Sequence, residues 1–158
     1  MRVQRIQSGG QTGADRAACD VAIALGNPLS GWCPRGRRAE DGVIPDRYDL
    51  RETDAAEYAV RTRLNVFEAD ATVLFTRGAP MGGSRLTAKI AGELGRPLLH
   101  VDLEDLEHDV ETAGAVLRAW LVRHRVRVLN VAGSRESEVP GIYATVYRFL
   151  LSALRDGP

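Results

Sequence analysis

The chain has few cysteines, few aromatic residues, no net charge and no long apolar run. Cys19 and Cys33 are its two cysteines, so a disulfide framework is not expected. Because Lys plus Arg and Asp plus Glu both number 21, no overall field draws the chain to nucleic acid or to an anionic membrane. No apolar run approaches the roughly 20 residues that span a membrane, and the N-terminus lacks the apolar core of a signal peptide. These absences predict a cytoplasmic protein with no membrane partner.

Length and composition predict one folded domain over residues 1–158. A hydrophobic content of 44% and a charged content of 27% are normal for a soluble globular protein. A chain of 158 residues is long enough to bury a core. No linker, repeat or low-complexity segment divides it.

Apolar periodicity predicts alternating strands and helices. Strands are expected at residues 3–7, 29–33, 71–76, 98–102 and 127–132. Helices are expected at residues 14–25, 54–69, 85–94, 113–124 and 142–153, and residues 35–52 form a long polar segment. This alternation predicts the α/β class: a Rossmann-like three-layer domain with a mainly parallel sheet and helices on both faces.

Glycine-rich turns follow three of the predicted strands, and each precedes a helix. They contain Ser8, Gly9, Gly10, Gln11, Thr12 and Gly13; then Gly82, Gly83 and Ser84; then Gly133, Ser134 and Arg135. Carboxyl ends of parallel strands meet at one edge of a sheet, so we expect the turns to lie together and to bind phosphate and sugar. The first turn is neither a dinucleotide fingerprint nor a P-loop, and Thr12 with Asp15 also fits a helix-capping pair.

Several ordered motifs resemble one family. They are residues 8–16 (SGGQTGADR), 31–37 (GWCPRGR), 39–42 (AEDG), 44–45 (IP), 61–62 with 65–66, 82–84 with 87–88, 129–133 (LNVAG) and 140–143 (PGIY). From about residue 3 to residue 150, the chain resembles the putative molybdenum carrier proteins, the circularly permuted YpsA-like branch of the SLOG superfamily. The resemblance implies a Rossmann-like fold. A strand ending in Gly-Ser-Arg usually opens a SLOG domain, but here it comes near the end, at residues 128–135.

The resemblance implies a protein that binds a nucleotide-derived or phosphorylated small ligand. It would serve as a molybdenum cofactor carrier or as a sensor of a nucleotide ligand. The molybdenum cofactor needs no metal ligand from the protein, because its pterin carries the phosphate. The sequence predicts no metal site, since His100, His108 and His124 are scattered and no Cys-x-x-Cys or His-Glu-x-x-His occurs.

Related phosphoribohydrolases cleave nucleoside 5′-monophosphates at the glycosidic bond, which makes hydrolysis the first alternative. Their Pro-Gly-Gly-x-Gly-Thr-x-x-Glu motif is broken here. Met81 replaces the proline and no Glu follows Thr87 by three residues, although Glu93 lies further along the predicted helix. A catalytic acid or base must lie within hydrogen-bond reach of its proton.

The expected ligand contacts combine backbone N–H groups with charged side chains. Arg61 and Arg135 suit phosphate because a guanidinium fork matches its oxygens. Asp15 would accept from a ribose hydroxyl or cap the helix, and the resemblance adds Thr62 and Asn65. The full set is Ser8, Gly9, Gly10, Gln11, Thr12, Gly13, Asp15, Arg16, Arg61, Thr62, Asn65, Gly82, Gly83, Ser84, Thr87, Gly133, Ser134 and Arg135.

The polar segment after the second predicted strand offers further candidates: Trp32, Cys33, Arg35, Glu40 and Asp41. Arginines close to Cys33 would lower its thiol pKa and make it reactive, unless it is a small buried residue. Trp32 would stack on a base, and the loop would place Glu40 or Asp41 over a ligand.

A single-stranded nucleic-acid binding module is the second alternative. Arg123, Arg125 and Arg127 cluster, but aromatic residues are 6% of the chain and its charge is balanced. We therefore expect a small phosphorylated ligand rather than nucleic acid. Related proteins often assemble, which implies a homo-oligomer.

Overall fold

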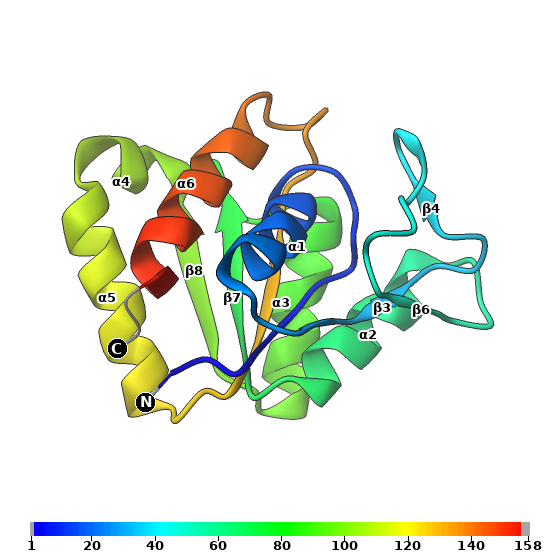
Figure 1. Cartoon of the computed structure of the whole chain (residues 1–158), viewed down its shortest axis with the longest axis horizontal. Coiled ribbons are helices and arrows are strands. Elements are labelled where there is room, and N and C mark those ends of the chain that lie inside the picture. Colours follow the sequence, from blue (N-terminus) through cyan, green and yellow to red (C-terminus); the bar gives the residue numbers. More distant parts are fainter. Residues whose placement is uncertain (1, 156–158) are drawn as a thin grey trace.

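A five-stranded sheet with the strand order β2-β1-β9-β7-β8 forms the centre of the computed structural model, which describes residues 2–155 (Figure 1). Its strands are β1 (Arg5–Gln7), β2 (Leu29–Ser30), β7 (Ala71–Thr76), β8 (Leu98–Asp102) and β9 (Val128–Gly133). Every neighbouring pair in this sheet is parallel. The predicted α/β class with a parallel Rossmann-like sheet is confirmed.

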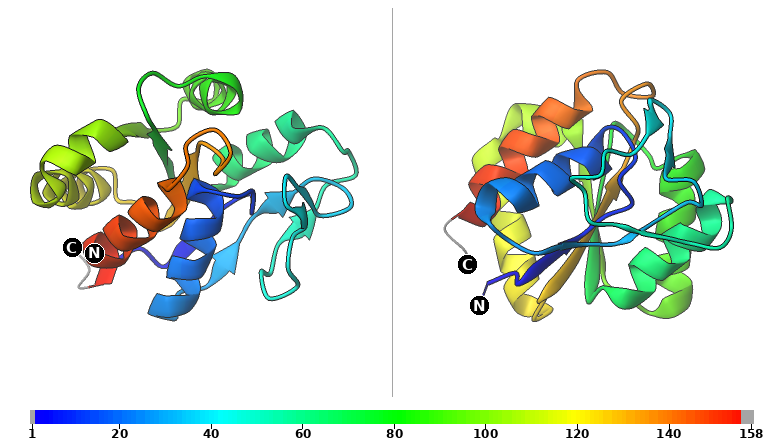
Figure 2. Two further views of the ribbon diagram at one scale, coloured as in Figure 1. Left: turned by 90° about the horizontal axis from the view of Figure 1, so that it is seen from above. Right: turned by 45° about the vertical axis from the view of Figure 1, so that its right-hand side comes forward.

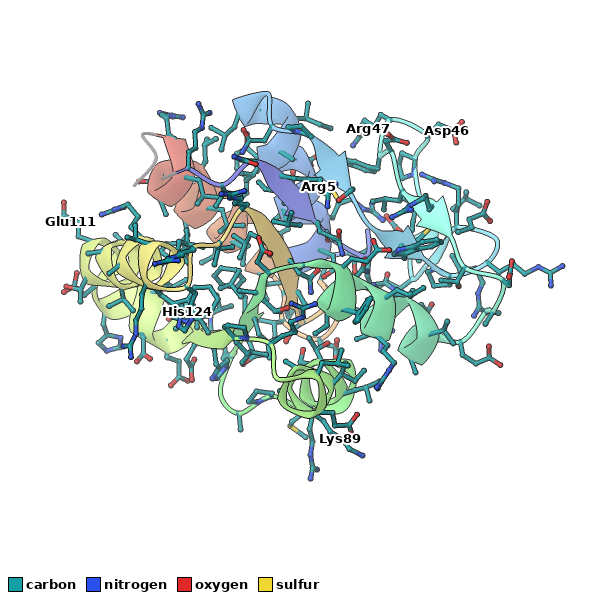
Figure 3. The ribbon with its side chains drawn as sticks, turned by 90° about the horizontal axis from the view of Figure 1, so that it is seen from below. Arg5, Asp46, Arg47, Lys89, Glu111 and His124 are labelled. Carbon is teal, nitrogen blue, oxygen red and sulfur yellow. The ribbon has the colours of Figure 1, made fainter. Side chains whose placement is uncertain are left out.

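Helices cover both faces of the sheet (Figure 2). One face carries α1 (Ala14–Leu25) and α6 (Ile142–Arg155), with α5 (Val110–Arg123) beside α6 and the short α4 (Leu103–His108) before it. The other face carries α2 (Tyr58–Glu68) and α3 (Gly82–Leu94). Seen from below, Lys89 projects from α3 away from the rest of the molecule, so the opposite side of this helix faces α2 and the sheet (Figure 3).

The larger core lies between the sheet and the α1–α6 face. The predicted stripe of α6 is buried, and Phe149 packs edge-to-face on Phe75 of β7 with ring centroids 5.7 Å apart. The inward face of α1 consists mainly of small residues, which lets the helix lie close to the strands: Ala14, Ala17, Ala18, Val21 and Ala22.

Residues 29–33 form two strands rather than the predicted one. Gly31 has φ 141°, and a Cβ there would lie 1.9 Å from the Ser8 carbonyl oxygen. The chain therefore turns at Gly31 and leaves the main sheet. Its continuation β3 (Trp32–Cys33) pairs with β6 (Arg51–Glu52).

The polar segment 35–52 is ordered around one arginine. It contains the hairpin of β4 (Arg38–Ala39) and β5 (Gly42–Val43). The Arg37 guanidinium donates hydrogen bonds to four backbone carbonyls, those of Ile44, Pro45, Tyr48 and Leu50. Ile44, Tyr48 and Leu50 then form a small core with Cys19 and Cys33.

Four of the five predicted helices differ from the structure at one or both ends. The helix expected at 54–69 is Tyr58–Glu68, and the one expected at 85–94 begins at Gly82. The helix expected at 113–124 is Val110–Arg123, and the one expected at 142–153 ends at Arg155. The short helix α4 was not predicted; its N-cap residue is Asp102, whose side chain accepts from the Glu104 N–H at 3.0 Å. Gly26 and Gly95 end α1 and α3 in the left-handed conformation, as expected for helix-terminating glycines.

Candidate functional site

A cavity of about 280 Å³ lies over the carboxyl half of β9, between helices α2 and α3. This volume lies just below the range of small-molecule sites, roughly 300–1,000 Å³. The turns that follow β1, β7 and β9 adjoin it, because these three strands are neighbours in the sheet. The view from above in Figure 2 looks onto this edge of the sheet. Its lining is Gly9, Gln11, Asp15, Tyr58, Arg61, Thr62, Asn65, Gly83, Ser84, Leu86, Thr87, Asn130, Val131, Ala132, Gly133, Arg135 and Glu138.

One face of α2 forms a wall of the cavity. Tyr58, Arg61, Thr62 and Asn65 all line it. Their spacing of i, i+3, i+4 and i+7 places them along a single helix face. Tyr58 was missed from the sequence, although this spacing of polar and aromatic residues would have found it.

Arg61 and Asp15 form an ion pair in the lining of the cavity. Arg61 Nη1 donates to Asp15 Oδ2 at 3.2 Å, and the two side chains are 12% and 8% exposed. The guanidinium lies on Gly9, where an added Cβ would be 1.5 Å from Arg61 Nη1. Arg61 Nε is buried and has no hydrogen-bond partner among the described residues. A buried N–H group without an acceptor is unusual in folded proteins.

Burial controls the ionisation of Asp15. It raises the pKa of the Asp15 carboxyl, and the charge of Arg61 and the hydrogen bond from the Gln11 N–H oppose this rise. The carboxyl is thus easier to protonate than an exposed aspartate.

The N-terminus of α3 opens onto the cavity. The N-cap residue is Met81, whose side chain makes no capping bond, and Gly83 and Ser84 line the cavity. The N–H groups of Ser84 and Arg85 bond to the Met81 carbonyl, whereas those of Gly82 and Gly83 have no acceptor within residues 2–155. Uncapped N–H groups and the positive end of the helix dipole favour an anion at this point.

The N-terminus of α1 is instead covered by protein. Gly13 is the N-cap residue, and the Ala14 N–H donates to the Ser134 carbonyl at 3.3 Å. A Cβ on Gly13 would lie 2.4 Å from that same oxygen, so glycine here permits close packing of two loops. The prediction that Thr12 caps α1 is wrong, because its hydroxyl donates to Glu40 and accepts from the Glu136 N–H.

Arg135 lines the cavity together with Glu138. Its Nε donates to Glu138 Oε1 at 3.3 Å, and its Nη1 lies 4.0 Å from Glu40 Oε2. Glu40 also accepts from the Ser137 hydroxyl at 2.5 Å and from the Ser137 N–H at 3.2 Å. The β4–β5 hairpin is therefore fastened to the loop that carries Arg135.

Glu40 is held as a carboxylate. Burial works against its charged form, but the hydrogen bonds from Ser137 and Thr12 outweigh burial and lower its pKa. The ionised form keeps the hairpin and the two loops together.

Part of the predicted site therefore meets at one cavity. The predicted residues that line it are Gly9, Gln11, Asp15, Arg61, Thr62, Asn65, Gly83, Ser84, Thr87, Gly133 and Arg135. Those outside the lining are Ser8, Gly10, Thr12, Gly13, Arg16, Gly82 and Ser134, followed by the loop candidates Trp32, Cys33, Arg35, Glu40 and Asp41. The residues that sequence reasoning missed are Tyr58, Leu86, Asn130, Val131, Ala132 and Glu138.

Two of the predicted ligand contacts are occupied by structural bonds. The Asn65 side chain accepts from the Trp32 N–H at 2.8 Å and donates to the Trp32 carbonyl at 2.9 Å, which extends the pairing of β3. Arg16 forms a two-bond pair with Asp41 at 3.0 and 3.1 Å, outside the cavity.

Of the two alternatives for Cys33, a reactive thiol or a small buried residue, the structure supports the buried residue. Cys33 is fully buried, and burial raises its thiol pKa despite the opposing charge of Arg37. Trp32, proposed to stack on a base, instead lies against the Arg51 guanidinium, 4.1 Å from the ring centroid. Glu93, considered as a catalytic substitute, pairs with Arg63 at 3.2 Å and does not line the cavity.

Neither a metal centre nor a membrane span is found in the part of the chain that the structure describes. No group of three or more His, Cys, Asp or Glu residues there is arranged to hold a metal ion. No helix in residues 2–155 is long and apolar enough to cross a membrane.

A parallel Rossmann-like sheet with a ligand-sized cavity at its carboxyl edge defines the class of protein. The chain belongs to the circularly permutated YpsA SLOG family, whose model matches residues 6–154. The place of β9 fits the permutation, since this last strand of the chain lies at the centre of the sheet.

The chain is also similar to a solved structure, described as a putative molybdenum carrier protein from Syntrophus aciditrophicus SB. The two are 41% identical with a TM-score of 0.93, over 96% of this chain and 95% of that one. No curated protein matches the sequence.

Proposed function

We propose that the cavity binds a phosphorylated small ligand, either nucleotide-derived or a pterin phosphate such as the molybdenum cofactor. The protein would hold this ligand as a carrier or as a sensor. The related structure is described as a putative molybdenum carrier, which supports the first role. Binding of the molybdenum cofactor as cargo needs no metal ligand from this chain, because the pterin itself holds the metal and bears the phosphate.

The observation that carries the proposal is a pair of unused donor groups. Arg61 Nε is buried without a partner among the described residues, and the N–H groups at the start of α3 lack acceptors there. The unpaired Arg61 Nε costs about 1–3 kcal/mol, which a shift of the guanidinium onto a ligand oxygen would recover. Gly82 and Gly83 are exposed, so their N–H groups are open to a ligand without any rearrangement. A phosphate supplies several acceptor oxygens at once.

The charges of the cavity favour a ligand with one phosphate group over a polyphosphate. Arg61 and Arg135 contribute two positive charges, and Asp15 and Glu138 two carboxylates. Each arginine is already paired with one of these carboxylates. The cavity therefore supplies directed donors rather than a large positive field.

Calorimetric titration with ribose 5-phosphate, adenosine 5′-monophosphate and adenosine tests this function. We expect both phosphates to bind and adenosine to bind at least tenfold more weakly. Arg61→Ala should weaken phosphate binding. Arg63→Ala, on the same helix but 54% exposed and paired with Glu93, should leave it unchanged. Equal binding of adenosine and its monophosphate would contradict the proposal.

Glycosidic hydrolysis of a nucleoside monophosphate is a second candidate, favoured by the two carboxyl groups that line the cavity. The raised pKa of Asp15 suits a general acid, and Glu138 is the other carboxyl. Release of free base from nucleoside monophosphates, lost in Asp15→Asn, would support this function. Its absence with bound nucleotide would leave the binding role.

Two further expectations belong to this proposal. We place the protein in the cytoplasm, where phosphorylated cofactors are exchanged, and we expect it to form a homo-oligomer, as the family resemblance implies. Light scattering of the purified protein measures the second.

A further inference from the structure

A row of polar side chains crosses the sheet below the cavity. Gln7 of β1 lies in register with Ser30 of β2 on one side and with Asn130 of β9 on the other. Asn130 is in turn in register with Thr72 of β7. Gln7 and Thr72 are 0% exposed and Asn130 is 2% exposed, so three polar groups are buried at one level of an otherwise apolar sheet.

Most of this row is satisfied internally. The Gln7 amide donates to the Asn65 carbonyl at 2.8 Å and accepts from the Ser30 hydroxyl at 3.1 Å. Both ends of that amide are used, which is usual for buried polar groups. Gln7 thus ties β1 to β2 and to helix α2.

Asn130 differs from Gln7 because one end of its amide remains free. Its Nδ2 donates to Thr72 Oγ1 at 3.2 Å. Its Oδ1 has no partner among residues 2–155, and Asn130 lines the cavity. The Thr72 hydroxyl accepts from Nδ2, which leaves Oδ1 as the end presented to a ligand. Because this oxygen is open to the cavity, a bound ligand can donate a hydrogen bond to it.

The cavity is charged at its entrance, the mouth, which is formed by Arg135 and Glu138, and uncharged at its inner end beside Asn130. Arg135 and Glu138 follow the end of β9, and Gly133 is its last residue. Asn130 lies three residues before Gly133, which places it about 10 Å deeper at roughly 3.3 Å per residue of strand. A ligand with its phosphate at the mouth therefore directs its other end at Asn130.

We propose that Asn130 Oδ1 selects among ligands by accepting a hydrogen bond from an amino group or ring N–H of the ligand's heterocycle. The inference rests on the proposed function, because the phosphate fixes which end of the ligand enters first. The selected class is a phosphorylated heterocycle whose inner edge carries an N–H donor. Ligands that lack this donor leave the buried acceptor unpaired and bind more weakly.

The test compares nucleotides that differ by one amino group. The pairs are adenosine 5′-monophosphate against purine riboside 5′-monophosphate, and guanosine against inosine 5′-monophosphate. In the wild-type protein the amino-bearing member of at least one pair should bind about tenfold more tightly. The variant Thr72→Val/Asn130→Leu replaces both hydrogen-bonding partners by apolar groups of similar shape, which limits the cost to folding. It should bind both members of each pair equally.

Two controls separate this inference from the function on which it rests. Ribose 5-phosphate has no heterocycle and contacts only the mouth of the cavity, so its affinity should be the same in the wild type and the double variant. Ser30→Ala disturbs the same polar row away from the cavity and should keep the amino preference. A wild-type protein that binds ribose 5-phosphate but treats each pair equally overturns the inference, as does a preference that survives in the double variant. Failure to bind ribose 5-phosphate or any of the nucleotides would instead contradict the proposed function.

Discussion

Adding one methyl group at Gly9 should remove the Arg61 guanidinium from the cavity. The Cβ of Gly9→Ala would lie 1.5 Å from Arg61 Nη1, 2.8 Å from its Cζ and 3.0 Å from Asp15 Oδ2. The atom in conflict is the far end of a flexible side chain, and Gly9 has no positive φ. The arginine should therefore move while the backbone stays.

The size of the effect follows from the bonds that Arg61 would make. A hydrogen bond to a charged group contributes about 1.5–3 kcal/mol. At 1.4 kcal/mol for each factor of ten, Gly9→Ala should weaken phosphate binding by about 10- to 140-fold. The displaced guanidinium also loses its 3.2 Å bond to Asp15, which a modest fall in the melting temperature would report.

A double-mutant cycle gives the decisive assay. Ribose 5-phosphate is titrated calorimetrically into the wild type, Gly9→Ala, Arg61→Ala and the double variant. If the methyl group acts by displacing the arginine, Gly9→Ala adds no further loss once Arg61 is alanine. Additive losses would show that Gly9 contributes by another route. Unchanged affinity in Gly9→Ala would refute the assignment of Arg61 as the anion anchor.

Three other perturbations test the packing and the ionisation of the structure. In Gly31→Ala, a residue with φ 141° would carry a Cβ 1.9 Å from a backbone oxygen, so chemical denaturation should show that the free energy of unfolding falls by about 2–3 kcal/mol or more. Gly92→Ala adds a Cβ in open space within α3 and should raise the free energy of unfolding by about 0.5–1 kcal/mol. Burial and the Asp20 hydrogen bond raise the pKa of Tyr48 from 10.0 to about 12, so its contribution to stability is complete below pH 10 and is lost as the pH rises toward 12. Tyr48→Phe should reduce the alkaline loss of stability in unfolding curves without abolishing it, because Tyr143 donates to the same Asp20 carboxylate and its pKa is also raised. The pKa of Glu40 is lowered from 4.5, so its carboxylate stabilises the fold above pH 4.5 and loses this effect as the pH falls. The difference in the free energy of unfolding between the wild type and Glu40→Gln should therefore shrink on acidification. A difference that grows in acid would contradict the assignment.

The sequence predicts the main sheet well because its strands carry their own signals. Residues 71–76 form a continuous apolar run bounded by polar residues, and the strand covers those residues, as does the strand predicted at 98–102. Gly26 and Gly95 mark helix ends through a local conformational requirement. Such features need no knowledge of distant contacts.

The segment 35–52 could not be predicted because its order depends on contacts distant in the sequence. Arg37 reaches carbonyls up to 13 residues away, and β3 pairs with a strand at Arg51–Glu52. An arginine in a polar stretch gives no sign of whether it binds backbone, ligand or solvent. The same uncertainty left two alternatives open for the Cys33 thiol, and its burial outweighs the nearby charges.

In the candidate site, too, features set by the sheet were predictable from the sequence, and features set by distant contacts were not. The glycine turns were located correctly at one edge because parallel strands determine where their ends meet. Whether a given glycine serves a ligand or close packing depends on atoms across the fold, as the 2.4 Å approach at Gly13 illustrates. Asn130 was missed because one polar residue in an apolar strand is usually satisfied internally, and only the pairing of its amide reveals a free end.

Native mass spectrometry of gently purified protein, with identification of the small molecules released on denaturation, shows whether the cavity holds a phosphorylated ligand. We expect one phosphorylated small molecule per chain in the wild type and its loss in Arg61→Ala, with Arg63→Ala still loaded. A wild-type protein that is empty and takes up no nucleotide, pterin phosphate or ribose 5-phosphate when these are added would contradict the proposed function. Equal loading of the Arg61→Ala variant would contradict the assigned cavity.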